Sequence, residues 1–122
     1  MIKRYATKDM SRIWSDQNKF ETWKNVEITV VEVLTEMGIV PKQSLKVIKD
    51  KADFSIERIN EIESKTHHDV IAFLTNLAEY IGPDSRFIHM GMTSSDLLDT
   101  SLALQCKEAG EIILSKLEFF KT

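Results

Sequence analysis

The sequence predicts an all-α protein, and three observations support this fold class. Only four glycines and two prolines occur among 122 residues, so few positions interrupt a helix. Several segments carry apolar residues three and four positions apart, which is the spacing of one helix face. Hydroxyl or acidic residues precede these segments, where they can cap the unpaired N–H groups of a first turn.

The N-terminal part predicts an extended segment, a short helix and a long one. Residues 1–6 are expected to be extended, and Thr7 can cap a turn that ends at Trp14. A long helix is predicted from Ser15 or Asp16, because apolar residues recur on one face. That face comprises Phe20, Trp23, Val26, Val30, Val33, Leu34 and Met37.

Two further helices are predicted in the middle of the chain. Gly38 can adopt the left-handed conformation that ends many helices, and Pro41 suits the first turn of the next one. That basic helix is expected to run towards Asp50. Ser55 can cap the following helix. Its apolar face comprises Ile56, Ile59 and Ile62.

Two helices complete the expected fold. The first follows residues 65–70, ends at Gly82 and carries an apolar stripe of Val70, Phe73, Leu74, Leu77 and Ile81. The last begins near Ser94 or Ser95. Its expected buried seam comprises Leu98, Leu102, Cys106, Ala109, Ile113, Leu117 and Phe120.

The last helix suggests how the chain is organised. We expect a helical domain over residues 1–93, followed over residues 94–122 by the start of a long helix. Because an apolar stripe of this length needs partners, the chain is expected to be a piece of a longer protein. Cys106 lies on the seam and is expected to be a buried thiol rather than a nucleophile.

Composition excludes several classes of function. The formal charge is −3, which gives no reason to expect a nucleic-acid partner. The single cysteine cannot form an internal disulfide, and no apolar stretch has the length of a leader or a membrane span. A cytoplasmic protein without a membrane partner is expected.

All three histidines fall in two short runs, over residues 65–70 and 88–100. Adjacent rings on a helix point about 100° apart, so His67 and His68 are poorly placed to share a metal ion, and no metal site is expected. Two interpretations of the first run remain open. Thr66 can be a helix cap with Asp69 in the first turn, or one ring and the carboxylate can face a cleft.

The second run is also open to two interpretations, which are compatible. Thr93 and Asp96 have the spacing of a capping box, and the same helix start can hold an anion. Asp96 would repel an anion unless it points elsewhere. His89 can face a phosphate or be solvated. By itself, the Arg4 segment would be interpreted as a frayed basic terminus.

Three segments together resemble one enzyme family. They are RYATKDMSRIW (4–14), KTHHDVIAFL (65–74) and HMGMTSSDLLDT (89–100). Their order and spacing resemble the N-terminal region of the adenylosuccinate lyase family, within the fumarase/aspartase superfamily. The resemblance covers essentially the whole chain. It implies the N-terminal helical domain of the fumarase/aspartase-like fold and the start of a long bundle helix.

The resemblance implies a reaction and a first set of site residues. The family eliminates fumarate from adenylosuccinate to give AMP, and from the succinylated aminoimidazole carboxamide ribotide. Arg4 and Tyr5 resemble contacts near the phosphoribosyl end of the substrate. His67, His68 and Asp69 match the family's HHD contact segment. His68 is the ring expected to engage the reacting part, and we therefore take it as the catalytic residue.

The remaining implied contacts lie in the second run. His89 resembles a phosphate-side histidine, while Thr93 and Ser94 resemble donors to a succinyl carboxylate. The family's general acid and base are expected beyond Thr122, and its sites are assembled in a homotetramer. The resemblance implies no cofactor. The chain alone is therefore expected to be inactive.

Two other functions remain open. One is a non-enzymatic helical interaction module that docks through its last helix. It predicts that His68 and Ser94 lie far apart, whereas a lyase requires both to border one concavity near His89. The other is a different fumarate-releasing lyase of the same superfamily.

Overall fold

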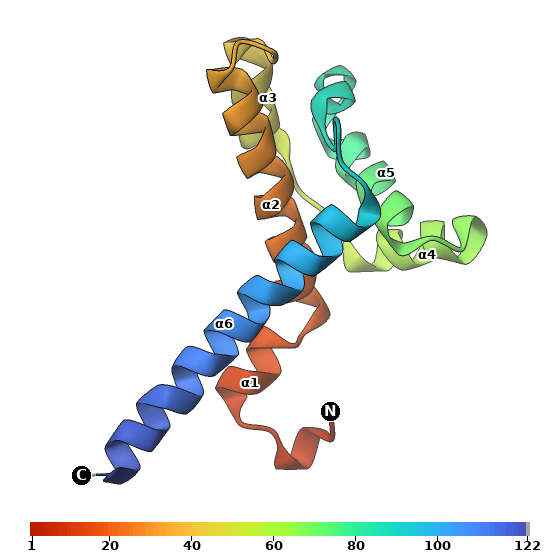
Figure 1. Ribbon diagram of the computed structural model, residues 1–122. Helices are drawn as coiled ribbons and strands as arrows, with labels where there is room; N and C mark the ends of the chain where they lie inside the picture. The colour runs from red at the N-terminus through yellow and green to blue at the C-terminus, as the bar shows by residue number, and fades with distance from the viewer. Residues whose placement is uncertain (122) are drawn as a thin grey trace.

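The computed structural model describes residues 1–121, and these residues form helices and no strand (Figure 1). The elements are η1 (Lys3–Tyr5), α1 (Lys8–Ile13), α2 (Asp16–Glu36), α3 (Lys42–Lys51), α4 (Ile56–Thr66), α5 (Asp69–Ile81), η2 (Pro83–Phe87) and α6 (Ser94–Lys121). The predicted all-α class is confirmed. The segment expected to be extended contains a short 3₁₀ turn, η1.

The predicted helix starts are confirmed at three hydroxyl caps. Thr7 accepts a hydrogen bond from the Met10 N–H at 3.3 Å. The hydroxyls of Ser15 and Ser55 do the same for α2 and α4, at 3.1 and 3.3 Å. Gly38, which follows the C-cap Met37 of α2, has φ +78°, as a left-handed stop requires. Pro41 is the residue before α3 rather than part of its first turn.

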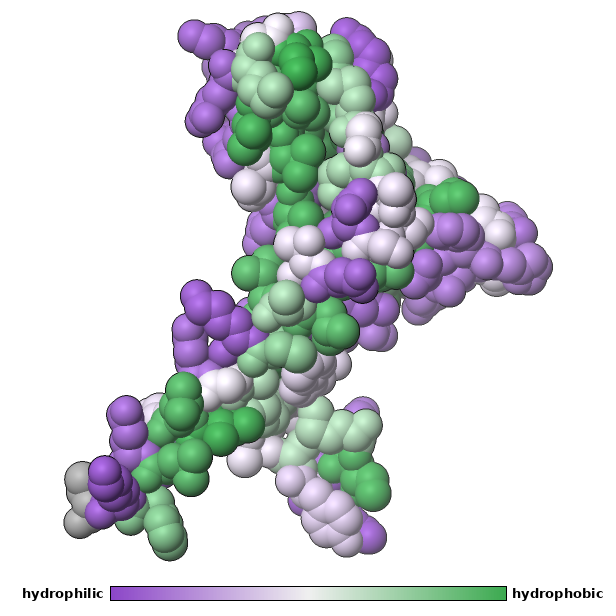
Figure 2. Space-filling model, viewed as in Figure 1, coloured by the Kyte–Doolittle hydropathy of each residue, from purple (hydrophilic) through white to green (hydrophobic). Residues whose placement is uncertain are grey.

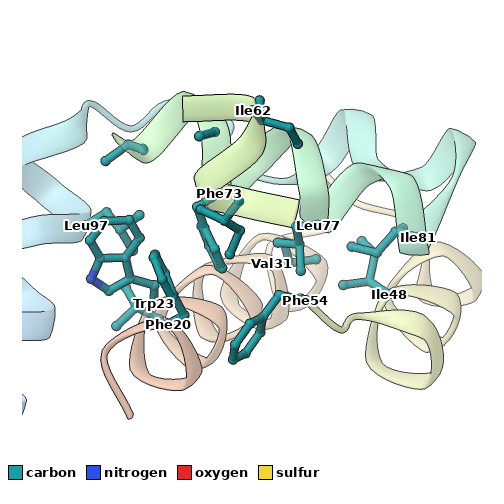
Figure 3. Packing of buried hydrophobic residues seen from close by; sticks show 14 of the residues in the cluster. Phe20, Trp23, Val31, Ile48, Phe54, Ile62, Phe73, Leu77, Ile81 and Leu97 are labelled. Carbon is teal, nitrogen blue, oxygen red and sulfur yellow. The ribbon is translucent and has the colours of Figure 1, made fainter. Parts of the chain in front are cut away.

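The core lies where α2, α4 and α5 meet. Four aromatic rings form its centre, and Figure 3 shows them together with Leu97 of α6. They belong to Phe20, Trp23, Phe54 and Phe73. The ring centroids of Phe20 and Phe73 are 5.7 Å apart, and those of Trp23 and Phe73 are 5.4 Å apart. The predicted stripe on α5 is confirmed, because Val70, Phe73, Leu77 and Ile81 are buried.

The predicted face of α2 is correct in the first half of the helix and wrong in the second. Phe20, Trp23 and Val26 are buried, but Val33 is 49% exposed and Met37 is 65% exposed. The face that stays buried continues instead through Glu27, Val31 and Thr35. The apolar pattern does not include Glu27 and Thr35, and it therefore predicts the wrong face for the second half of the helix.

The predicted seam of α6 is correct at two positions and wrong at the other five, for the same reason. Ala109 is buried and Leu98 is half-buried, but the remaining members are exposed. The buried residues are Leu97, Ser101, Gln105 and Ala109, a spacing of four that includes two polar side chains. The expected seam lies about one residue away and is largely exposed, with Leu102 at 51%, Ile113 at 51%, Leu117 at 58% and Phe120 at 90%. Cys106 is also exposed, which corrects the expectation of a buried thiol.

Polar side chains on the buried faces join helices that are distant in sequence. The Gln105 amide donates to the Ile13 carbonyl oxygen at 3.0 Å, which attaches α6 to the end of α1. The buried Asn76 of α5 accepts from the Ser55 N–H at 2.8 Å, immediately before α4. These contacts explain why polar residues occupy positions that the apolar pattern did not include.

The second half of α6 extends away from the core. Figure 1 shows α6 crossing α2 and running beyond the other helices, and Figure 2 shows hydrophobic side chains gathered on its outer half. Helix α6 begins at Ser94, as expected. The division of the chain into two units at that point stays a prediction.

Candidate functional site

The HHD segment forms the corner between α4 and α5. Helix α4 ends at Thr66, and His67 has φ +52°, which breaks the helical path. His68 is the N-cap of α5, because its Nδ1 accepts from the Ile71 N–H at 3.2 Å. The interpretation with Thr66 as the cap is therefore wrong. Asp69 is the first residue of α5.

The capping bond determines which nitrogen of His68 is available. An Nδ1 that accepts a hydrogen bond carries no proton, so the proton of the neutral ring is on Nε2. His68 can then offer an Nε2–H to a ligand without disturbing the helix start. The Asp69 carboxylate is nearby, 3.7 Å from Nδ1, and it accepts from the Val70 N–H at 2.8 Å. The His67 side chain lines a separate hollow with Asn60, Glu63 and Ser64.

The second run forms the capping pattern that its spacing predicted, with the hydroxyl bonded to the N–H two residues on rather than three. The Thr93 hydroxyl accepts from the Ser95 N–H at 3.2 Å, and the Asp96 carboxylate accepts from the Thr93 N–H at 2.8 Å. Asp96 thus points back at its own helix start, but it is exposed, and the hydrogen bond leaves its carboxylate beside any anion bound there. Neither bond uses the hydroxyl of Ser94, which is half-buried.

His89 is held by a residue that sequence reasoning missed. Its ring is only 19% exposed, so it is not simply solvated. The Glu27 carboxylate accepts from the main-chain N–H of His89 at 2.9 Å, and its second oxygen lies 2.5 Å from Nδ1 of the His89 ring. Glu27 is fully buried. A charged residue on the same helix face as Phe20 and Trp23 was the one signal that could have identified it.

Burial also changes the proton affinity of Glu27. It raises the pKa of this carboxyl above its ordinary value of 4.5, because the charged form loses water. The hydrogen bonds and the charge of His89 act in the opposite direction. Glu27 therefore holds its proton more tightly than an exposed carboxyl does, because burial outweighs the effect of His89.

The structure brings the two helix starts to the same core. Val70 and Phe73 of α5 and Leu97 of α6 belong to one buried cluster, and Figure 3 shows Leu97 beside Trp23. His68 and Ser94 precede these core residues by only two and three positions, respectively. A hollow lined in part by Gly91, Met92 and Asp96 lies between α2 and α6. That His68 and Ser94 border one concavity stays a prediction.

Arg4 and Tyr5 lie elsewhere. Both are exposed in η1, where the Arg4 guanidinium lies 4.8 Å from the centre of the Tyr5 ring. Figure 1 shows this segment beyond α1, at the end of the molecule away from α4 and α5. Within one chain, the structure does not bring these two residues to the HHD segment.

Within residues 1–121, no three His, Cys, Asp or Glu side chains are grouped so that they could hold a metal ion. No helix in the described part of the chain is both long and apolar enough to cross a membrane.

Curated relatives agree with the resemblance that the motifs indicated. The chain is 50% identical over 118 residues to an adenylosuccinate lyase of Synechocystis sp., covering 97% of the chain and 27% of the relative. It is 44% identical over 120 residues to an adenylosuccinate lyase of Bacillus subtilis, covering 98% of the chain and 28% of the relative. The chain therefore spans just over a quarter of the length of these relatives.

Solved structures share the fold at low sequence identity. A fumarate lyase from Mesorhizobium sp. BNC1 has a TM-score of 0.84 at 20% identity, covering 93% of this chain and 27% of that one. A β-carboxy-cis,cis-muconate cycloisomerase from Acinetobacter calcoaceticus sp. ADP1 has a TM-score of 0.79 at 23% identity, covering 92% and 28%. A family model described as Lyase matches residues 3–122. The chain therefore belongs to this Lyase family.

Proposed function

We propose that the chain forms the N-terminal, substrate-binding part of an adenylosuccinate lyase. The observation that carries this proposal is the 50% identity over 118 residues with an enzyme of that name. The reaction would eliminate fumarate from adenylosuccinate to leave AMP, and likewise from succinylaminoimidazole carboxamide ribotide. Both substrates carry a phosphate and two carboxylates, so they need several sites that bind anions.

His68 is the proposed catalytic residue of this chain. Elimination requires a base for a carbon-bound proton and an acid for the departing nitrogen, and both groups are expected beyond Thr122. The ring of His68 caps α5 through Nδ1 and offers an Nε2–H, which suits a hydrogen bond to the reacting part of the substrate. His67 and Asp69 flank it as further substrate contacts.

Thr93 and Ser94 are the proposed contacts of a succinyl carboxylate. The start of the 28-residue helix α6 presents the positive end of the helix dipole, and the Ser94 hydroxyl there is not used by the capping bonds. Asp96 is exposed beside this helix start and accepts from the Thr93 N–H, so an anion would bind on the side of the start away from that carboxylate. His89, in the loop before the helix, is the proposed phosphate contact.

Arg4 and Tyr5 support an assembled site. Because they lie away from the HHD segment in one chain, we propose that a second copy supplies them, in a homotetramer. The exposed apolar side chains on the outer half of α6 would then pack in a central helical bundle. The complete protein is proposed to be cytoplasmic and to need no cofactor.

The direct test uses the complete protein with adenylosuccinate as substrate. Fumarate release is expected from the complete protein and not from residues 1–122 alone. Mixing inactive Arg4→Ala and His68→Ala subunits should restore part of the activity, because some mixed sites receive both native residues. Absence of fumarate release from the complete protein would contradict the proposal.

The apolar face of α6 also suits a helical interaction module, since Leu114, Leu117 and Phe120 are more than half exposed. A module of this kind would bind a partner without any turnover. A different lyase of the superfamily would release fumarate from argininosuccinate or another succinylated amine and leave adenylosuccinate intact. A panel of these substrates on the complete protein separates the three functions.

A further inference from the structure

A buried carboxylate supports the loop that carries His89. Glu27 lies in the middle of α2 and is 0% exposed. Its Oε2 accepts from the His89 main-chain N–H, and its Oε1 lies against the ring Nδ1. One side chain thus holds both the backbone and the ring of a single residue, 62 positions away in the sequence.

The loop needs this support because its backbone is unfavourable. His89 has φ +62°, a left-handed conformation that residues with a side chain seldom adopt. Gly91 has φ +76°, but glycine adopts that conformation without strain. A histidine stays in such a geometry where surrounding contacts determine it, and the two bonds to Glu27 are contacts of that kind.

The contact also determines what the outer edge of the ring can do. One proton lies between Glu27 and Nδ1 when the pair is net neutral. If that proton is on nitrogen, the ring is an imidazolium with a second hydrogen on Nε2. If it is on the carboxyl, Nδ1 accepts and the neutral ring again carries its hydrogen on Nε2. In both arrangements Nε2, on the side away from Glu27, is a hydrogen-bond donor. In the anionic pair, Nδ1–H would donate to the Glu27 carboxylate and Nε2 would be an acceptor, so an oxyanion bound at Nε2 favours the neutral pair.

We propose that Glu27 is a positioning residue that fixes the His89 loop and directs the Nε2–H of His89 towards an anionic oxygen of the substrate. This inference rests on the proposed function, in which that oxygen belongs to the phosphate. Glu27 does not touch the substrate and acts only through His89. A donor with a fixed direction binds an oxyanion without the cost of ordering a mobile loop.

Two substitutions of Glu27 separate positioning from packing in the complete protein. In Glu27→Gln the amide oxygen can accept from the His89 N–H and the amide nitrogen can donate to Nδ1, which keeps the hydrogen on Nε2. Its KM for adenylosuccinate is expected within about threefold of the unmodified protein, since both contacts remain. Glu27→Met fills the space with an unbranched apolar chain but offers neither contact, and a roughly tenfold to hundredfold rise in KM is expected.

The control variant is Thr35→Val, which removes a different buried polar group of α2, a hydroxyl. Thr35 bonds to the Val31 carbonyl of its own helix, so its loss should leave KM unchanged. A purely structural role for Glu27 would lower the fraction of folded enzyme and hence kcat, with KM unaltered. The proposal predicts instead that Glu27→Met raises KM and leaves kcat unaltered, because the contact with the anion is made on binding.

A double-variant comparison completes the test. In a His89→Phe background, Glu27→Met should change KM by less than about twofold, because the residue through which it acts is absent. An equal effect in both backgrounds would overturn the inference, as would an unchanged KM in Glu27→Met. If neither Glu27→Met nor Glu27→Leu folds, the pair serves the core and the inference fails. Loss of fumarate release from the unmodified protein would instead refute the proposed function itself.

Discussion

Replacing Ser101 by alanine is expected to stabilise the chain, although the residue is fully buried in α6. Its hydroxyl has no hydrogen-bond partner among residues 1–121. An unsatisfied buried polar group costs about 1–3 kcal/mol, which the substitution would recover. Alanine is also the better helix former, by about 0.5 kcal/mol. The loss of one oxygen atom leaves a cavity that costs only a few tenths of a kcal/mol.

The net expectation is a gain of about 1–3 kcal/mol in the free energy of unfolding, or roughly 4 °C in Tm for each kcal/mol. Urea unfolding followed by circular dichroism measures it. Ser115→Ala is the matched control, because Ser115 is exposed on the same helix and only the helix-propensity gain remains. If Ser101→Ala is no more stabilising than Ser115→Ala, the buried face assigned to α6 is wrong.

Three further outcomes are expected. Burial raises the pKa of Glu27 above 4.5. Relative to Glu27→Gln, the contribution of Glu27 to the free energy of unfolding is therefore greatest below pH 4.5 and is lost as the pH rises through the raised pKa. An unfolding free energy that differs between the two proteins by the same amount at every pH would contradict this. His68→Asn in the complete protein should keep the N-cap and change stability by less than about 0.5 kcal/mol. Fumarate release by this variant should nevertheless fall by about a hundredfold or more. If the variant lost stability and fumarate release together, His68 would serve only as the helix cap. Cys106 is exposed, so a thiol reagent should modify it in the folded chain as fast as in the unfolded one. A much slower reaction in the folded chain would show that the thiol is buried.

Helix starts were predictable because the contacts that make them are local. The side chains of Thr7, Ser15 and Ser55 each cap an N–H three residues further along the chain. Thr93 and Asp96 form their capping pattern within the same span. No other part of the molecule is needed for these bonds to form.

The corner at residues 66–68 was harder to predict. Thr66 has the side chain of a common cap, but the cap of α5 is a ring nitrogen of His68. The left-handed conformation of His67 shifts the helix start by two residues. Since histidine seldom adopts that conformation, the sequence favoured the more common arrangement.

Buried faces were predictable only where they are apolar. The face of α5 consists almost entirely of aliphatic and aromatic residues, and its predicted stripe is correct. The faces of α2 and α6 contain Glu27, Ser101 and Gln105, and a count of apolar residues led away from them. Glu27 and Gln105 are tolerated on these faces because other elements supply their partners, which the local sequence does not reveal.

The sequence by itself determined the helical class, the helix starts capped by hydroxyls at Thr7, Ser15 and Ser55, and the three segments that indicate the lyase family. These properties depend on residues within a turn or two of each other, or on the order of short motifs. Only the tertiary structure decided that Glu27 holds His89, that Gln105 bonds to Ile13 across 92 positions, and that Arg4 lies apart from the HHD segment. Such contacts depend on which helices meet, and that follows from packing the whole chain around one core.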